Sequence, residues 1–439
     1  MQYLFPLLLA VATGAYCQQE NCEAACRLEF EKAFASESNQ WVAQNVSLDS
    51  FYDIPENASG AKPGDLLRWQ QLTPEQQTQS WNIPKGLSVA RFLYLSEDID
   101  GSPLLASAFA VLPANHTGGD LDTVVWTHGT AGHIRNCAPT NHKQLYYGET
   151  VFGFAQQGYA VIGPDYTGLG TDIPQGFMYE SGFLHAADGA FGLVAARAAI
   201  GSQLSDKWAV VGHSEGGLTA WRTAERLAMP DQEALLAAGQ FVGAVSIAPA
   251  LRPLDLITES FERANGGPVG DVVSTYLLQS LARIFPEQIR IKDYLTDLAL
   301  DRLKLIDRAC LETGDALFGN LTKDETFKDI TWLTHPVVVD WQKRYNGLGP
   351  HSLAAPMLVV QGEDDPLTYA SATESDFNST CAAFPESSAG LLLYTGKDHD
   401  GVLEPSTEDV FAWLADRFNN VALAEGCQKR TIQASSGKL

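Results

Sequence analysis

One serine of this 439-residue chain stands in a pattern that suits nucleophilic catalysis. Ser214 lies within Gly212-His213-Ser214-Glu215-Gly216, after the apolar run Trp208 to Val211 and before the helix-forming segment Leu218 to Met229. At such a strand-to-helix turn the serine is held out at the sheet edge, and small flanking residues avoid collisions with the neighbouring strand and helix. The pattern therefore predicts a nucleophile elbow, in which the backbone N–H of Glu215 faces a developing oxyanion. A glycine-rich helix start is the plain alternative.

A serine nucleophile needs a general base, and chain order selects one histidine. On scaffolds that carry such an elbow, the carboxylate and then the histidine follow the serine in the sequence. Downstream of the strand predicted at Pro356 to Gln361 the only histidine is His399, in a loop after the strand predicted at Leu391 to Tyr394. We therefore predict His399 as the base. His128 is expected to buttress a loop by hydrogen bonding, and His213 to serve packing.

The carboxylate that orients the base is expected directly after the strand at Pro356 to Gln361. Three acids, Glu363, Asp364 and Asp365, follow the turn glycine Gly362. Asp365 occupies the third place after this glycine and is the preferred partner of the histidine, with Asp364 as the second choice. Glu363 is expected to be a solvated turn residue.

A second oxyanion donor is expected from the loop after the strand predicted at Thr123 to Trp126. This loop contains Gly129, which lets the backbone approach a substrate, and then Thr130. We predict that the N–H groups of Thr130 and Glu215 together form the oxyanion hole.

Strand-like runs that alternate with helical segments predict an α/β fold. The alternation of strands and helices implies a mostly parallel central sheet with helices on both faces. A hairpin formed by Val89 to Leu95 and Leu104 to Leu112 precedes it in the chain. Between Ala248 and Ala355 the strand pattern stops and helical periodicity replaces it, which predicts an inserted helical cap; an all-helical domain without a role at the site is the alternative. The expected organisation is a signal peptide at 1–17, an N-terminal wrap at 18–85, a catalytic core at 86–250 and 351–418, the cap at 251–350 and a C-terminal tail at 419–439.

The N-terminus and the cysteines predict an extracellular protein. The apolar run Tyr3 to Ala12 followed by small residues is typical of a cleaved secretory signal and is too short to span a bilayer. Cleavage could follow Ala15 or Cys17, and the cysteine count favours the second site because it leaves an even number. We expect these cysteines to form disulfides of unassigned connectivity: Cys22, Cys26, Cys137, Cys310, Cys381 and Cys427. Glycosylation sequons begin at Asn45, Asn57, Asn115, Asn320 and Asn378.

Charge and motifs exclude several function classes. The formal net charge is −24 and the isoelectric point about 4.6, so the chain is expected to repel nucleic acid and anionic membranes. The sequence contains no zinc-binding His-Glu-x-x-His, no phosphate-binding Gly-Lys-Ser/Thr loop and no dinucleotide fingerprint. We therefore expect neither a metal nor a cofactor. The sequence carries no signal of oligomeric state.

Several motifs together resemble the fungal and bacterial secretory lipase family of the lipase A type. They are His128-Gly129-Thr130 with Cys137-Ala138-Pro139-Thr140, Gly158 to Gly170, and Lys207 to Gly217, and the resemblance extends from about Ala90 to Phe418. It implies an α/β-hydrolase core, a helical cap before the acid-bearing strand, and carboxylic ester hydrolysis by Ser214, Asp365 and His399. Glu215 departs from the glutamine or small residue that relatives often carry, and its charge would favour a protonated imidazole.

The resemblance leaves the substrate open, because the family ranges from triacylglycerol lipases to deacetylases of small metabolites such as trichothecenes. The apolar faces of the cap helices suit transient contact with a lipid interface, or burial against the core.

Two other functions compete with that of an esterase. A serine peptidase on the same fold is disfavoured because serine carboxypeptidases tend to carry glutamate before the serine, whereas here it follows. A non-catalytic binding protein is disfavoured because all three triad candidates are retained.

Overall fold

A computed structural model describes residues 19–114, 116, 120–270, 272–423 and 425–433, with side chains from Cys26 onward. The predicted signal peptide at 1–17, the sequon residue Asn115, the side chain of Cys22 and the last six residues lie outside the described part.

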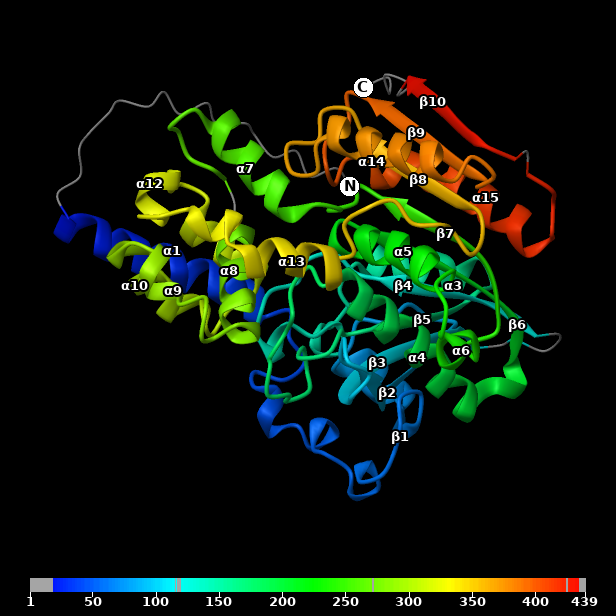
Figure 1. Ribbon diagram of the computed structural model, residues 1–439. Helices are drawn as coiled ribbons and strands as arrows, with labels where there is room; N and C mark the ends of the chain where they lie inside the picture. Colours follow the sequence, from blue (N-terminus) through cyan, green and yellow to red (C-terminus); the bar gives the residue numbers. More distant parts are fainter. Residues whose placement is uncertain (1–18, 115, 117–119, 271, 424, 434–439) are drawn as a thin grey trace, which may run out of the picture.

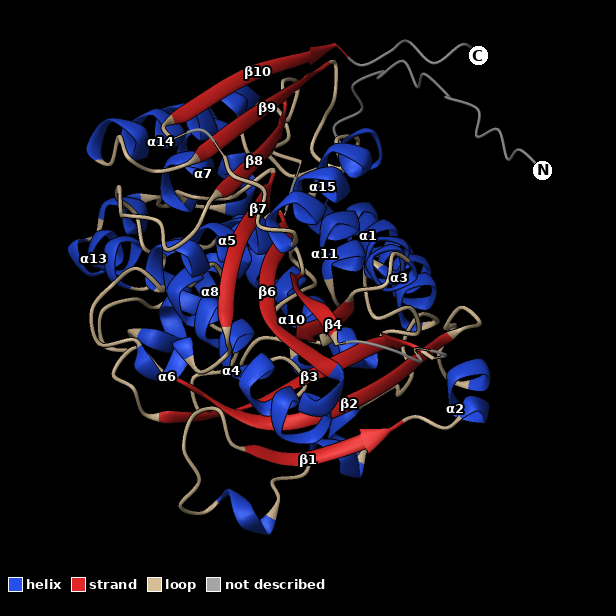
Figure 2. Ribbon diagram, turned by 90° about the vertical axis from the view of Figure 1, so that its right-hand side faces the viewer, coloured by secondary structure: helices blue, strands red, loops and turns tan. Residues whose placement is uncertain are grey.

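The described residues form one ten-stranded sheet in the order β1-β2-β3-β5-β4-β6-β7-β8-β9-β10 (Figure 2). The first three strands and the β3–β5 pair are antiparallel, and every pair from β5 to β10 is parallel. The predicted hairpin is β2 with β3, and the mostly parallel sheet is confirmed. The bounds are β1 Leu66–Gln71, β2 Leu87–Glu97, β3 Pro103–Pro113, β4 Leu121–Thr127, β5 Ala160–Pro164, β6 Leu204–His213, β7 Gln240–Ile247, β8 Met357–Gly362, β9 Ala389–Thr395 and β10 Cys427–Gln433.

Helices cover both faces of the sheet, as Figure 2 shows for α5 and α15 on opposite sides of β7. On one face α4 and α5 bury side chains such as Leu193 and Trp221, and on the other α3 and α15 bury Val151 and Leu414. These buried apolar stripes explain why the alternating sequence folds into three layers. The bounds are α2 Pro74–Gln79, α3 Gly148–Gln156, α4 Gly182–Ile200, α5 Glu215–Arg226, α6 Glu233–Leu236, α14 Ala370–Ala383 and α15 Leu403–Phe418.

Within the described residues, one stretch is long and apolar enough to cross a membrane. It runs from Gly182 to Gln203 and is 78% buried within the protein. It therefore serves as the central core helix α4, packed between β2 and α5.

A helical segment separates β7 from β8 and appears as the green and yellow helices at the left of Figure 1. It has its own apolar core, which includes Leu277, Ile306, Trp332 and Trp341. The long N-terminal helix α1 packs against α11 and contributes Phe30 to this core. The bounds are α1 Gln19–Ser38, α7 Pro253–Ala264, α8 Val273–Ile284, α9 Ile291–Tyr294, α10 Asp297–Ile306, α11 Leu311–Phe318, α12 Lys323–Thr326 and α13 Pro336–Arg344.

Both ends of the described chain are more ordered than the predicted wrap and tail suggest. Residues 18–85 include the helix α1 and the edge strand β1, and residues 427–433 of the tail form β10, which pairs in parallel with β9. The sequence Cys427 to Gln433 is mainly polar, so it lacks the apolar alternation by which strands are recognised. Its pairing with β9 and a disulfide to Cys381 hold it at the sheet edge.

The structure pairs four cysteines, as Cys137–Cys310 and Cys381–Cys427. Among the described side chains Cys26 has no disulfide partner, in contrast to the prediction from the sequence, and its Sγ accepts a hydrogen bond from Arg302 Nη2 at 2.9 Å.

Candidate active site

Ser214 occupies a strained turn at the junction of β6 and α5. Its backbone angles are φ 61° and ψ −121°, a region that costs a non-glycine residue about 1–3 kcal/mol. A Cβ at Gly212 would collide with the carbonyl of Gly216, and one at Gly216 with the carbonyl of Thr127. The Ser214 N–H donates to Ile247 O at the end of β7, at 2.9 Å. The two glycines and this bond permit the elbow and hold the half-buried serine at the carboxyl edge of the sheet.

Asp365 and His399 are brought together from the loops after β8 and β9. His399 Nδ1 lies 2.8 Å from Asp365 Oδ2, and both side chains are buried. Asp365 also accepts hydrogen bonds from the backbone N–H groups of Leu367 and Thr368, from the Thr368 hydroxyl and from Gln361 Nε2. Burial would raise the pKa of Asp365, but the contacts with His399, Thr368 and Leu367 outweigh it, so the pKa lies below its ordinary value. The carboxylate is thus held ionised beside the imidazole.

His213 links the elbow to the histidine loop. Its Nε2 donates to the carbonyl oxygen of His399 at 2.9 Å, and its Nδ1 lies 2.9 Å from the Tyr147 hydroxyl. Burial lowers the pKa of His213 to about 3, so it stays neutral. The residue predicted to serve packing therefore also anchors the loop that carries His399.

The loop after β4 lies against Ser214. A Cβ at Gly129 would lie 2.5 Å from the Tyr147 hydroxyl, 3.1 Å from the carbonyl oxygen of His213 and 3.2 Å from Ser214 Cβ, so glycine permits this close approach. Thr130 is held on two sides, because its carbonyl accepts from the Tyr146 hydroxyl at 2.6 Å and its Oγ1 lies 2.8 Å from the Tyr179 hydroxyl.

The expected buttressing role of His128 is confirmed. Its ring nitrogens lie 2.7 Å from Gly129 O and 3.3 Å from Asp165 O, and its ring stacks on Tyr166. Burial lowers the pKa of His128 to about 4, which keeps the ring neutral.

A cavity of about 530 Å³ opens at this edge of the sheet. Its polar end is lined by Ser214, Thr130 and Asp365. The opposite wall is apolar and comes from the helical segment between β7 and β8: Pro253, Leu256, Ile257, Pro268, Val269, Val273 and Leu277. Glu363 and Asp364 are exposed at the mouth, as expected for Glu363, while Asp365 alone of the three acids is buried. The volume and lining are those of a small-molecule site.

Comparisons with known proteins agree with this architecture. The model of the alpha/beta hydrolase family matches residues 124–413. The chain belongs to the alpha/beta hydrolase family. Lipase A of Candida antarctica has a similar fold, with a TM-score of 0.69 and 16% identity over 90% of each chain. The rice cell wall degrading esterase LipA of Xanthomonas oryzae has a TM-score of 0.62 and 16% identity over 82% of this chain and 99% of its own. No curated protein sequence matches the chain.

Two residues at the site of this alpha/beta hydrolase were missed by sequence reasoning. Tyr179 and Glu180 precede α4 and line the cavity. Glu180 has φ 58°, a left-handed conformation that is unusual for glutamate. Neither belongs to a motif, and only their place between the Gly158 to Gly170 motif and a long helix pointed to this region.

The described residues contain one cluster with the spacing of metal ligands, namely His213, His399 and Asp400, whose ligand atoms lie within 4.8 Å of one another. Both ring nitrogens of His213 are already hydrogen-bonded, and His399 Nδ1 faces Asp365. These hydrogen bonds occupy the ring nitrogens of His213 and one ring nitrogen of His399.

Proposed function

We propose that the protein is a secreted serine carboxylic ester hydrolase that forms an acyl-enzyme on Ser214. The observation that carries the proposal is the 2.8 Å contact between His399 and a carboxylate clamped by further donors, next to a serine held at a strained elbow. A buried carboxylate that orients one imidazole nitrogen fixes the other as the base.

In the proposed reaction, Ser214 Oγ attacks the ester carbonyl while His399 Nε2 takes its proton. Asp365 stabilises the imidazolium through Nδ1–H, and the N–H groups of Thr130 and Glu215 stabilise the oxyanion. His399 then protonates the leaving alcohol. A water molecule, activated by the same histidine, cleaves the acyl-enzyme and frees the acid.

The cavity favours a small soluble ester over an emulsified triacylglycerol. Within the described lining, Leu367 is the one large apolar side chain that is exposed, at 44%. Its neighbours at the mouth are the exposed acids Glu363 and Asp364 and the exposed Pro366. A lipid-binding rim needs a contiguous apolar patch. We therefore favour deacylation of a compact metabolite, of which a trichothecene ester is one example, over interfacial lipolysis.

Secretion is supported by two disulfides and by the exposure of the sequon residues Asn45, Asn57, Asn320 and Asn378. Disulfides persist in oxidising compartments, and exposed asparagines are accessible to glycan transfer. These features agree with the signal peptide predicted at 1–17.

Substitution of the nucleophile tests the proposal. Ser214→Ala is expected to remove hydrolysis of p-nitrophenyl acetate and butyrate and labelling by a fluorophosphonate probe, because Ser214 carries the acyl intermediate in the proposed mechanism. Ser260→Ala is the matched control, since Ser260 lines the same cavity from α7 but takes no part in the reaction. Unchanged ester hydrolysis in Ser214→Ala contradicts the mechanism. Faster cleavage of a peptide panel than of esters would favour the peptidase, and a wild-type chain that neither labels nor hydrolyses would favour a binding protein.

A further inference from the structure

The side chain of Glu215 is connected to the opposite half of the proposed oxyanion hole. Its carboxyl Oε1 accepts the backbone N–H of Glu180 at 3.1 Å. The adjacent residue, Tyr179, places its hydroxyl 2.8 Å from Thr130 Oγ1. Two hydrogen bonds, bridged by the Tyr179 side chain and the peptide unit that follows it, thus join the two residues whose N–H groups are proposed to bind the oxyanion.

Glu215 is fully buried and has a second carboxyl group nearby, that of Glu180, which is 4% exposed. Glu215 Oε2 and Glu180 Oε2 are both buried without a hydrogen-bond partner of standard geometry among the described residues. The titratable groups that face Glu215 are Glu180 before α4, His185 in α4, Tyr147 at the start of α3 and Tyr166 after β5. Behind them, Tyr179 contacts Glu180 and His128 lies near His185.

None of these neighbours supplies a positive charge. Burial lowers the pKa of His185 to about 3 and that of His128 to about 4, so both rings are neutral at working pH. Burial also raises the pKa of Tyr166 and Tyr147, which keeps their hydroxyls protonated. Two buried carboxyls without a cation cannot both ionise at low cost.

We propose that Glu215 is a positioning residue, which acts as a neutral carboxylic acid and holds the Thr130 half of the oxyanion hole through Glu180 and Tyr179. The inference rests on the proposed function. Burial raises the pKa of Glu215 to about 8, with the Glu180 amide and the Thr130 hydroxyl opposing, and raises that of Glu180 well above its ordinary value. Both carboxyls are therefore protonated at neutral pH.

Ionisation of Glu215 would place a negative charge one residue from the nucleophile and beside the developing oxyanion. This charge opposes the transition state, because the alkoxide and the carboxylate repel each other in a poorly solvated site. Activity is therefore expected to decline above about pH 8, as the carboxyl loses its proton.

The test is the pH profile of kcat and KM for p-nitrophenyl butyrate, from about pH 6 to about pH 9.5. Glu215→Gln retains an acceptor for the Glu180 N–H and cannot ionise, so the shape of its pH profile is expected to change: relative to its own maximum, kcat no longer declines at alkaline pH. Glu215→Ala removes the link and is expected to lower kcat about 10–100-fold with little change in KM. Tyr179→Phe is expected to lower kcat while the alkaline decline stays in place.

Glu225→Gln is the matched control. Glu225 lies in the same helix, is also fully buried and also has a pKa raised by burial, to about 7, but it pairs with Arg222 away from the cavity. Its substitution is expected to leave the pH profile unchanged.

An alkaline decline that is identical in wild type and Glu215→Gln, or an unchanged kcat in Glu215→Ala, overturns the inference. Because Glu215→Gln is isosteric, a folding defect in the alanine variant leaves the pH test intact. Failure of the proposed function is distinguishable, since the wild-type chain itself would then lack hydrolysis that depends on Ser214.

Discussion

At the scale of single residues, the site assigns different environments to three consecutive acids. Asp365 is buried and accepts four hydrogen bonds besides its contact with His399, whereas Glu363 and Asp364 are exposed at the cavity mouth. An oriented, ionised carboxylate is what holds an imidazole in the tautomer that can accept the serine proton. The three side chains can therefore be separated by experiment, although they are neighbours in the sequence.

Asp365→Asn is expected to lower kcat about 10⁴-fold, because an amide at this position no longer stabilises the imidazolium and favours the wrong tautomer. Asp364→Asn and Glu363→Gln serve as controls, because each also replaces one neighbouring carboxylate by the corresponding amide. Both are expected to leave kcat close to that of wild type. Steady-state kinetics of the three variants decide the assignment. A large loss in Asp364→Asn with an active Asp365→Asn would reassign the carboxylate.

The proposed nucleophile and base could be selected from the sequence, because the expected chain order of serine, acid and histidine restricts the candidates. Ser214 was predictable because its strained turn demands glycine at fixed positions, and His399 because it is the one histidine after the strand predicted at Pro356 to Gln361. Tyr179 and Glu180 could not be selected in this way. Their contacts with Thr130 and Glu215 depend on the tertiary path of the loop before α4, in which Glu180 has a positive φ. Local sequence carries little information about such a tertiary contact.

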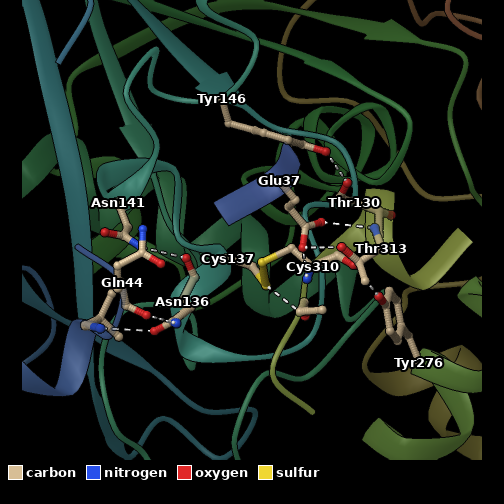
Figure 3. Close-up of a disulfide and its surroundings, with 12 residues drawn as sticks. Glu37, Gln44, Thr130, Asn136, Cys137, Asn141, Tyr146, Tyr276, Cys310 and Thr313 are labelled. Carbon is tan, nitrogen blue, oxygen red and sulfur yellow. Dashed lines mark hydrogen bonds between the residues drawn. A yellow bond between two sulfur atoms is a disulfide. The ribbon is translucent and has the colours of Figure 1, made fainter. Parts of the chain in front are cut away.

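At the scale of elements, one disulfide joins the site to the helical segment. Cys137 follows the Thr130 loop and Cys310 precedes α11, and Gly132 packs against both. Figure 3 shows the carboxylate of Glu37, from α1, accepting hydrogen bonds from Cys310 N and from Thr313 at the same place. Three distant segments of the chain thus meet behind the loop that contains Thr130.

Replacing each disulfide in turn by two serines is expected to distinguish an effect on the free energy of unfolding from an effect on kcat. By the entropy of loop closure, Cys137–Cys310, with a sequence separation of 173, contributes up to about 5 kcal/mol, and Cys381–Cys427, with 46, up to about 4 kcal/mol. Both double serine variants are expected to unfold at lower urea concentration. Only the Cys137/Cys310 variant is also expected to lose kcat, roughly tenfold, because Leu311 N donates to Ala131 O beside Thr130. Equal kcat losses in both variants would contradict this link.

The elements that sequence reasoning placed well are those with a strong periodic pattern. The strands and helices around Ser214 bury continuous apolar faces, and so do the helices between β7 and β8. The edge strands β1 and β10 were missed because a strand at the rim of a sheet need not alternate apolar and polar residues. Helix α1 has almost no amphipathic character along its length, and it finds its place through single contacts such as Phe30 and Glu37.

At the scale of the whole molecule, charge and cavity point to the same class of substrate. The net charge of −24 and the exposed acids at the cavity mouth oppose approach to anionic surfaces. The apolar wall of the cavity accommodates a compact acyl or alcohol group. Both properties suit a neutral ester in solution.

A series of p-nitrophenyl esters from acetate to oleate, dissolved and emulsified, tests this preference. The ratio kcat/KM is expected to be highest for short chains in solution and to show no rise at the onset of emulsion, because the cavity mouth lacks an extended apolar rim. Ser214→Ala measured in parallel corrects for spontaneous hydrolysis. A maximum at long chains with activation by emulsion would instead identify a lipase.

The position of the proposed base along the chain has a consequence for biosynthesis. Ser214 is synthesised before the residues that complete its site. Its backbone N–H donates to the carbonyl of Ile247, and its proposed catalytic partners are Asp365 and His399. Domains emerge from the ribosome N-terminus first. A nascent chain that has been translated only as far as β7 carries the serine without the acid or the base, so hydrolytic activity begins only after residue 399 has been synthesised and β9 has joined the sheet.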